Sequence, residues 1–546
     1  MDWTALVAAK QQECAAKIPP AWRLDPALIA ALTAPGVNLL AADVPRTSGL
    51  LSSLELEITE QYSAQELLQK LAGGVFTSKD VTLAYCKRAA IAQQLTSCLT
   101  ETMFEAAQQR AQELDDHLAR TGKPVGPLHG LPVSVKDSFL VAGVQATVGY
   151  VEFLKRPPET TNSPLIELLL SLGAVIYVKT NIPQTMMTGD SHNNIFGRTL
   201  NPHNTSLTAG GSSGGEGSLV AFRGSPLGVG TDVAGSIRIP ALCCGVYGFK
   251  PTVDRVPYGG QVSEGPEGMP GLKPAAGPLA SSFEDLEVFM SSVINAEPWR
   301  FDVSAMGGSW SEAPSTSTTT LTIGIPAPDE DFPLHPPVRR SLDEAIAKLE
   351  AAGHKIVHLP SPPPESSIAH ANRLAFEYFI YAPAPDHITP SGEPPVPSVA
   401  AKSSPMFTGP LPVPLEGEPD LSETITKLYA LRQAYAEFWR KIWVEYSLDI
   451  VLAPGAQSTA VEHDTYGWPP YTLVWNLLDY PACLIPFGKS SKELDPEPFT
   501  LTDGVQPSYN PELVDGAPCA VQVIAPRFQD ERCLQAAKIV DGVLSL

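Results

Sequence analysis

Pairs of an amphipathic helix and a short apolar strand recur along this chain of 546 residues. The first pair is SPLIELLLSLG at 163–173, followed directly by AVIYVK at 174–179. Serine at the cap, proline at the first helical position and glycine after the end mark the helix. The same pairing returns at 337–359, and again where 425–446 precedes DIVLAP at 449–454. Helices that alternate with buried strands predict an α/β fold.

The charge of the chain limits its partners. Hydrophobic residues make up 43% and charged residues 18%, as in ordinary globular proteins, and the formal net charge is −22. Nucleic acids and anionic membranes bind clustered lysine and arginine. We therefore expect neither as a partner, and expect a neutral or cationic small molecule instead.

The eight cysteines are scattered, without the C-x-x-C spacing of a zinc site or a disulfide framework. We expect reduced, mostly buried thiols and no metal. Residues 1–10 carry charge and lack the apolar core of a signal peptide, and no uncharged apolar stretch is long enough to span a bilayer. These features predict a cytoplasmic protein without a membrane-spanning segment.

The chain divides into an arm and a main domain. Residues 1–62 are expected to form a partly helical N-terminal arm, and residues 63–546 the main domain, because helical periodicity behind serine caps starts at Ser63. Proline is concentrated at about 326–337 and 383–419, where few apolar residues are available for a core. We expect surface loops there.

A lysine ends the alternating apolar run of LPVSVKDS, at 131–138. Lys136 follows Val133 and Val135 on what reads as a strand. Dehydration raises the free energy of an ammonium, so a lysine held there can lose its proton near neutral pH and act as a base. The alternative is a strand-end lysine that pairs with Asp137 or faces solvent.

The segment GGSSGGEG at 210–217 has too few side chains to pack. Its glycines either form a flexible linker or let the backbone approach another element closely. The helix-compatible residues 216–222 follow, and a helix start presents free NH groups to a developing anion. No G-x-x-x-x-G-K-[ST] motif occurs, so a nucleotide-binding loop is excluded.

The turn GTDVAGSIRIP at 230–240 offers donors and a hydroxyl. Four backbone NH groups could converge there on one oxyanion, namely those of Val233, Ala234, Gly235 and Ser236. Asp232 and Arg238 would hold the turn by charge-assisted hydrogen bonds, or would form an ordinary surface ion pair.

Amide hydrolysis needs an activated hydroxyl and donors for the charge that develops on oxygen. Lys136, Ser212 and Ser236 can supply a base, a relay hydroxyl and a nucleophile without any histidine.

The stretch from about 129 to 256 resembles the amidase signature family, and its flanks are most similar to fungal acetamidases and, less closely, to fatty acid amide hydrolases. The motifs that carry this resemblance are TNIPQ from Thr180, FGRTLNP from Phe196, GGSSGGEG from Gly210, GVGTD from Gly228, GSIRIP from Gly235 and YGFKP from Tyr247. The resemblance implies a single large domain, with a central mixed β-sheet covered by helices on both faces.

The resemblance also implies roles for single residues. Ser236 would be the nucleophile that forms the acyl-enzyme, Ser212 a bridging serine on a cis peptide bond, Lys136 the base that draws the proton through Ser212, and Ser213 a supporting hydrogen-bonding residue. The implied activity is hydrolysis of a small carboxamide to the acid and ammonia or an amine, with no cofactor. A homodimer is the oligomer to expect, if one forms.

Two methionines and the two residues before the nucleophile also bear on the site. Met186 and Met187 resemble residues that line the acyl pocket of the family, although a helical methionine pair more often belongs to the core. The family usually has Gly-Gly before the nucleophile, where this chain has Ala234 and Gly235. Alanine keeps its backbone NH, so the predicted oxyanion hole is retained unless this position needs a positive φ. An alanine with positive φ would cost about 1 kcal/mol of backbone strain.

Other hydrolase classes fit the sequence less well. GSSGG at 211–215 satisfies G-x-S-x-G, which would make Ser213 the nucleophile of an α/β-hydrolase esterase. That motif needs a buried strand before it, and residues 200–209 are polar and contain proline. A penicillin-binding-type enzyme would need S-x-x-K, which is absent. An esterase of the same serine-lysine type, or the amide-cleaving subunit of an amidotransferase, stays open.

Overall fold

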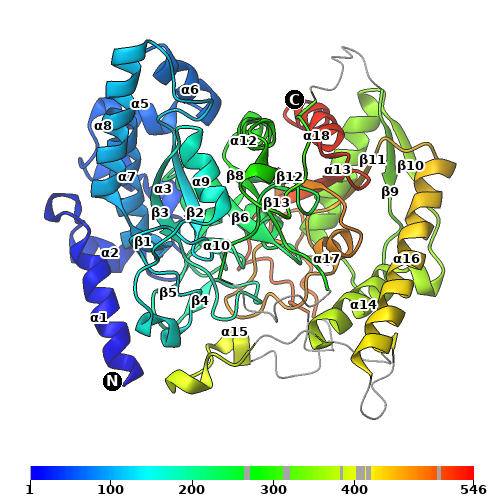
Figure 1. Cartoon of the computed structure of the whole chain (residues 1–546). Coiled ribbons are helices and arrows are strands. Elements are labelled where there is room, and N and C mark those ends of the chain that lie inside the picture. The colour runs from blue at the N-terminus through cyan, green and yellow to red at the C-terminus, as the bar shows by residue number, and fades with distance from the viewer. Residues whose placement is uncertain are drawn as a thin grey trace.

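An 11-stranded sheet forms the centre of the molecule (Figure 1). The computed structural model describes residues 2–262, 271–311, 320–381, 385–400, 412–413, 420–500 and 506–546. The strands of the large sheet are β1 (Leu99–Thr102), β2 (Pro132–Lys136), β3 (Val175–Thr180), β6 (Leu227–Asp232), β7 (Tyr247–Lys250), β8 (Ala275–Ala280), β9 (Thr322–Ile325), β10 (Lys355–His358), β11 (Ile450–Pro454), β12 (Ala482–Lys489) and β13 (Pro518–Ile524). A separate small sheet pairs β4 (His192–Asn193) with β5 (Gly197–Arg198).

The sheet is mixed, as the resemblance implies. Its strand order is β1-β3-β2-β6-β8-β7-β12-β13-β11-β9-β10. Strands β3, β2 and β6 run parallel to one another, as do β11, β9 and β10, while β8, β7, β12 and β13 pair antiparallel with their neighbours. Every residue of β2, β3, β6, β8, β11 and β13 is buried, so both faces of the sheet are covered.

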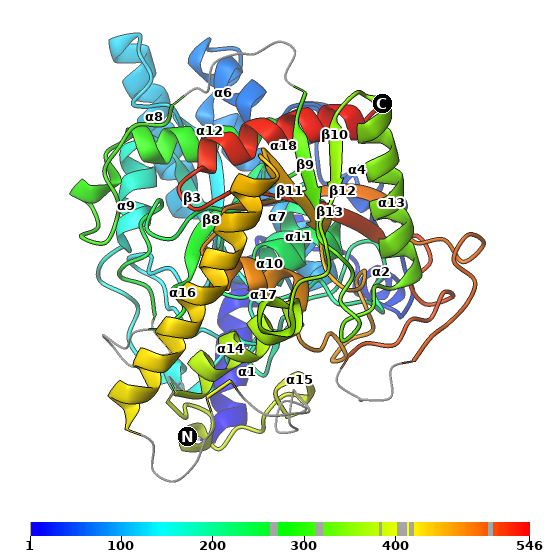
Figure 2. The ribbon, with the colours of Figure 1, turned by 90° about the vertical axis from the view of Figure 1, so that its right-hand side faces the viewer.

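Helices supply this cover. They are α1 (Trp3–Ala16), α2 (Pro26–Leu32), α3 (Leu39–Ala42), α4 (Val44–Thr47), α5 (Ser53–Glu60), α6 (Ala64–Ala72), α7 (Ser78–Thr96), α8 (Phe104–Thr121), α9 (Pro164–Ser171), α10 (Gly214–Ala221), α11 (Arg238–Cys244), α12 (Phe283–Asn295), α13 (Pro336–Ala351), α14 (Ile368–Tyr381), α15 (Pro397–Ala400), α16 (Leu421–Glu445), α17 (Pro470–Leu477) and α18 (Asp530–Leu544). Figures 1 and 2 show α12 and α18 above the central strands and α10 and α17 below them. The predicted α/β fold is confirmed.

The helix-strand pairs read from the sequence form where they were predicted. Helix α9 starts with Pro164 at its first position, and Gly173 after its end has φ +92°, a conformation that favours glycine. Strand β3 follows directly, and the pairs α13 with β10 and α16 with β11 repeat the arrangement.

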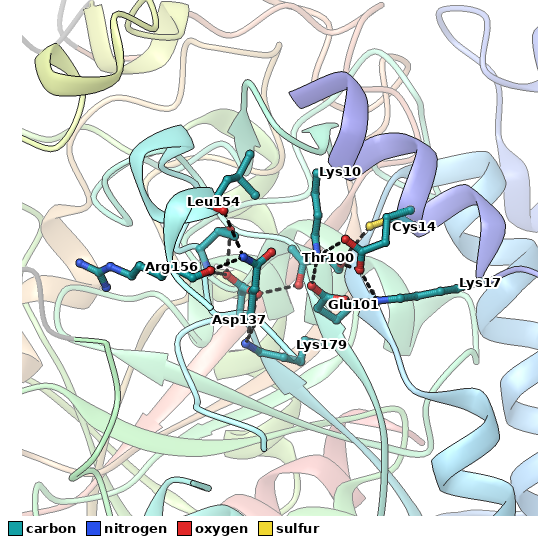
Figure 3. Close-up of polar contacts among 12 residues, drawn as sticks. Lys10, Cys14, Lys17, Thr100, Glu101, Asp137, Leu154, Arg156 and Lys179 are labelled. Carbon is teal, nitrogen blue, oxygen red and sulfur yellow. Dashed lines mark hydrogen bonds and ion pairs between the residues drawn. The ribbon is translucent and has the colours of Figure 1, made fainter. Parts of the chain in front are cut away.

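The N-terminal residues 2–62 carry helices α1 to α5. Leu39 and Ile58 are buried in the same hydrophobic cluster as the strands β2 and β3. Helix α1 is tied to β1 by Lys10 and Lys17, which both pair with Glu101 (Figure 3). The domain boundary at residue 62 stays a prediction.

The proline-rich stretches are described in part. Residues 326–335 are irregular, and α13 begins at Pro336. Of the stretch 383–419, the structure describes 385–400 and 412–413, and the other residues lie outside the described part. Within 385–400, Glu393 is buried and accepts hydrogen bonds from the backbone NH of Val151 and from Gln184. This part of the predicted loop therefore packs against the body of the molecule.

All eight cysteines are free thiols, and seven of them are buried, as predicted. Within the described residues, no helix has both the length and the apolar character needed to cross a membrane.

Candidate active site

Lys136 lies at the end of β2 with its side chain fully buried. Its Nζ lies 2.6 Å from Ser212 Oγ and 2.7 Å from Thr231 Oγ1. Strands β2 and β6 are parallel neighbours, so Lys136 and Thr231 reach the same edge of the sheet. The structure thus brings the predicted base into contact with the predicted relay serine, and excludes the alternative in which Lys136 faces solvent.

The neighbouring carboxylate, Asp137, has other partners (Figure 3). Its Oδ1 accepts from Thr100 Oγ1 at 2.7 Å and lies 3.3 Å from Lys179 Nζ of β3. Its Oδ2 accepts from the backbone NH groups of Thr147 and Val148. Both Asp137 and Lys179 are buried, so this ion pair balances a charge that would otherwise lie next to Lys136.

The glycine loop before α10 is closely packed, which excludes the flexible linker. A Cβ atom at Gly211 would lie 2.2 Å from the carbonyl oxygen of Thr188, and one at Gly215 would lie 2.3 Å from the backbone nitrogen of Asn181. Only glycine fits such approaches. The peptide bond between Gly211 and Ser212 is cis, as the resemblance implies.

The loop contacts the turn that carries Ser236. The backbone NH of Ser213 donates to the carbonyl oxygen of Ser236 at 3.2 Å. The Oγ of Ser213 accepts from the backbone NH of Thr231 at 3.3 Å. These contacts bring the relay loop and the predicted nucleophile side by side, and Ser213 supports the arrangement through hydrogen bonds.

The peptide between Ala234 and Gly235 is held at both ends. Its carbonyl oxygen accepts from Thr472 Oγ1 of α17 at 2.6 Å, and its NH donates to Asp232 Oδ1 at 2.8 Å. The positive φ of the turn falls on Gly235, at +127°, and Ala234 is not among the described non-glycine residues with positive φ. Alanine therefore occupies its position without backbone strain.

This arrangement corrects the predicted oxyanion hole. The NH of Gly235 is occupied by Asp232 and cannot face an anion. Within the described part of the chain, the NH groups of Val233, Ala234 and Ser236 donate to no protein acceptor. Sequence reasoning could not separate these four groups, because the orientation of the Asp232 side chain decides between them.

Asp232 and Arg238 form a fully buried pair, not a surface ion pair. Arg238 Nε and Nη2 lie 3.0 Å from the two carboxylate oxygens, and Nη2 also donates to Asn476 Oδ1. Burial raises the pKa of Asp232, but the charge and hydrogen bonds of Arg238 outweigh it and bring the pKa to about 2. A charged carboxylate is thus available to hold the turn.

A cavity of about 60 Å³ opens beside Ser236. Its larger apolar side chains are Met186, Met187, Ile239, Phe379, Tyr466 and Trp468. Both predicted methionines therefore line the cavity, but they lie in a turn after β3 and not on a helix, and Met186 has φ +51°.

Several residues of the site were missed by sequence reasoning. Thr472 and Asn476 lie one turn apart on α17 and contact the turn before Ser236, while Phe379 and Trp468 wall the cavity. Trp468 is held by a hydrogen bond from its Nε1 to Asn372 Oδ1. No local motif marks these residues, because only the tertiary fold brings them to the site.

The α/β-hydrolase alternative finds no support. The strand β5 ends at Arg198, and no strand of the large sheet leads into Ser213, which is itself fully buried. Among the described residues, His463 contacts Asp190 and the carbonyl oxygen of Thr205, and no hydrogen bond joins a histidine to Ser213 or Ser236.

Comparison with known proteins decides the family, since the family model described as Amidase matches residues 80–534. The chain belongs to the amidase family. This amidase is 41% identical over 544 residues to an amidase of Gibberella moniliformis, covering 100% of this chain and 99% of the relative. It is 38% identical over 559 residues to an acetamidase of Emericella nidulans, with 100% and 98% covered.

Among solved structures, a fatty acid amide hydrolase superposes with a TM-score of 0.85 at 30% identity, covering 100% of this chain and 95% of that one. The amidase is therefore an enzyme that hydrolyses amide bonds, as the resemblance implies.

Proposed function

We propose that this amidase cleaves small neutral carboxamides through Lys136, Ser212 and Ser236, with an acyl-enzyme on Ser236. The observation that carries the proposal is the 2.6 Å contact between Lys136 Nζ and Ser212 Oγ in a fully buried setting. An amine there can accept a proton from the Ser212 hydroxyl, and the loop that carries Ser212 is joined to Ser236 by the hydrogen bond from the backbone NH of Ser213.

The proposed reaction has two halves. In the first, Ser236 Oγ attacks the amide carbonyl while its proton passes to Ser212, whose own proton passes to Lys136. The NH groups of Val233, Ala234 and Ser236 hold the oxyanion of the tetrahedral intermediate. Ser212 then protonates the leaving nitrogen and recovers its proton from Lys136. In the second half, water activated by the same relay attacks the ester of Ser236 and releases the carboxylic acid.

The cavity beside Ser236 supports a small, neutral acyl group. Its volume of about 60 Å³ is enough for only a few molecules the size of water. The wall is mostly apolar, and among the described residues that line it the one titratable side chain is Tyr466, whose pKa burial raises well above the usual range. A charged acyl group would lose its hydration there without finding an opposite charge. The name of the Emericella relative, an acetamidase, agrees with this size.

A panel of primary amides of increasing acyl length, with secondary amides and matched esters, tests the proposal on the wild type and on Ser236→Ala. We expect turnover to be highest for the shortest amides and to vanish in the variant. Equal turnover by both proteins would remove Ser236 as the nucleophile, and faster cleavage of the esters would favour the esterase alternative.

The same assay addresses the amidotransferase alternative. Turnover by the purified chain alone supports an enzyme that acts without a partner protein, whereas activity that appears only with added partners supports the alternative. The cytoplasmic location and the homodimer also remain proposals.

A further inference from the structure

A buried acid, Glu216, lies in the first turn of α10 directly after the serine loop. Its Oε2 lies 2.6 Å from Ser134 Oγ of β2, and its Oε1 accepts from Thr180 Oγ1 of β3 at 2.8 Å. A Cβ atom at Gly228 of β6 would lie 2.2 Å from Oε2. Glu216 thus touches three neighbouring strands, and the mechanism proposed above does not use it.

The hydrogen bonds around Glu216 determine where its protons lie. Ser225 Oγ lies 2.9 Å from the carbonyl oxygen of Leu227. A carbonyl oxygen can only accept, so the Ser225 hydroxyl donates its single proton to it. The 2.9 Å contact between Ser134 Oγ and Ser225 Oγ then requires Ser134 to donate. Ser134 Oγ is placed to donate either to Ser225 or to Glu216 Oε2, which lies 2.6 Å away, but its one proton cannot serve both. With that proton assigned to Ser225, the contact with Glu216 takes its proton from the carboxyl group.

We propose that Glu216 is a neutral carboxylic acid at neutral pH, and that it is a positioning residue which ties the serine loop to β2 without placing a negative charge near Lys136. The chain of donors runs from the Glu216 carboxyl group through Ser134 and Ser225 to the carbonyl oxygen of Leu227. The role in catalysis rests on the proposed function of Lys136, whereas the protonation state does not.

The surroundings agree with a neutral acid. Burial raises the pKa of Glu216 to about 8, although its hydrogen-bonding contacts with Ser134 and Thr180 and the charge of Lys136 partly oppose the rise. The other titratable groups that face it are Tyr177 of β3 and Cys98, and burial also raises the pKa of each. Lys136 is therefore the only one of these groups that a carboxylate would affect at neutral pH. A carboxylate would stabilise its ammonium form and reduce the fraction of free base.

The variant Glu216→Gln tests the proposal, because its amide group has the shape of a carboxylic acid, donates to Ser134 and accepts from Thr180. We expect kcat/KM within about threefold of the wild type and an unchanged acid limb of the pH profile, since hydrogen bonds and charge are both kept. In infrared difference spectra at pH 7, the variant should lose the carbonyl band of a protonated carboxyl group.

Two results would overturn the proposal. One is the loss of a carboxylate band, in place of the acid band, in that difference spectrum. The other is an acid limb that moves by about one pH unit or more to lower pH in the variant, since it would show that a negative charge had been holding the ammonium form. The infrared result does not depend on activity, so failure of the proposed catalytic role and failure of the protonation state remain distinguishable.

Ser225→Ala provides a second measurement should Glu216→Gln not fold. Without Ser225, Ser134 becomes free to donate to Glu216 and to stabilise its carboxylate. We expect the acid band of this variant to disappear at a pH about one unit lower than in the wild type. An unchanged titration would contradict the donor chain.

Discussion

Replacing Thr472 with valine removes one hydroxyl and keeps the size of a fully buried side chain. The hydroxyl donates to the carbonyl oxygen of Ala234 at 2.6 Å, while the NH of the same peptide donates to Asp232. These two bonds fix the plane of the peptide, and thereby aim the adjacent NH groups of Ala234 and Ser236 at the proposed oxyanion. The valine variant releases one of the two.

The expected fall in kcat can be estimated by comparison with variants that lose a hydrogen-bond donor of the oxyanion hole. Removing one oxyanion donor costs about 100- to 1,000-fold in kcat. Thr472→Val keeps every donor and only loosens their aim, so we expect kcat to fall by about tenfold, equivalent to about 1.4 kcal/mol. KM should change little, because the hole binds the developing charge more strongly than the ground-state carbonyl.

Steady-state kinetics on the shortest turned-over amide, together with thermal unfolding, measures this effect. Thr472→Ser is the matched control, because it restores the hydroxyl and should return kcat to near the wild-type value. A folded valine variant with unchanged kcat would refute the reasoning, as would a serine variant that is no better than valine.

Three further predictions concern charge and volume. Arg238→Met should lower the free energy of unfolding by about 3–5 kcal/mol in denaturant titrations, because it leaves the Asp232 carboxylate buried and unpaired; a loss below about 1 kcal/mol would contradict this. Because the pKa of Glu216 is raised from 4.5 to about 8, its neutral form stabilises the fold fully below pH 4.5, and this stability is lost as the pH rises through about 8. The stability of the wild type relative to Glu216→Gln should therefore fall by about 1.4 kcal/mol per pH unit across that window, and parallel pH curves would be the contrary result. Phe379→Ala enlarges the cavity, and should raise kcat/KM for an amide one methylene longer by about tenfold relative to the shortest amide, whereas an unchanged ratio would place the acyl group elsewhere.

The sequence was most informative where the signals are local. Ser163, Pro164 and Gly173 mark the two ends of α9. The apolar run that follows them forms the buried strand β3. Lys136, Ser212 and Ser236 could also be selected from the sequence, because all three lie within the short stretch that carries the family motifs.

The rest of the site depends on tertiary packing. Thr472 is 238 residues from Ala234 in the chain, and it reaches the turn only because α17 packs against it. The hydrogen bond of the Gly235 NH depends on the orientation of the Asp232 carboxylate, which Arg238 of the same turn and Asn476 of the distant helix α17 fix together. The methionine pair was read as helical because an isolated pair carries no signal for a turn.

Covalent trapping tests the central claim most directly. Intact-protein mass spectrometry, followed by peptide mapping, would be applied to enzyme quenched during turnover of a slowly deacylating amide or ester. The account predicts one acyl group on Ser236, no adduct in Ser236→Ala, and acylation slowed by at least about 100-fold in Lys136→Ala. An adduct on Ser213, or acylation of Lys136→Ala at the wild-type rate, would contradict it.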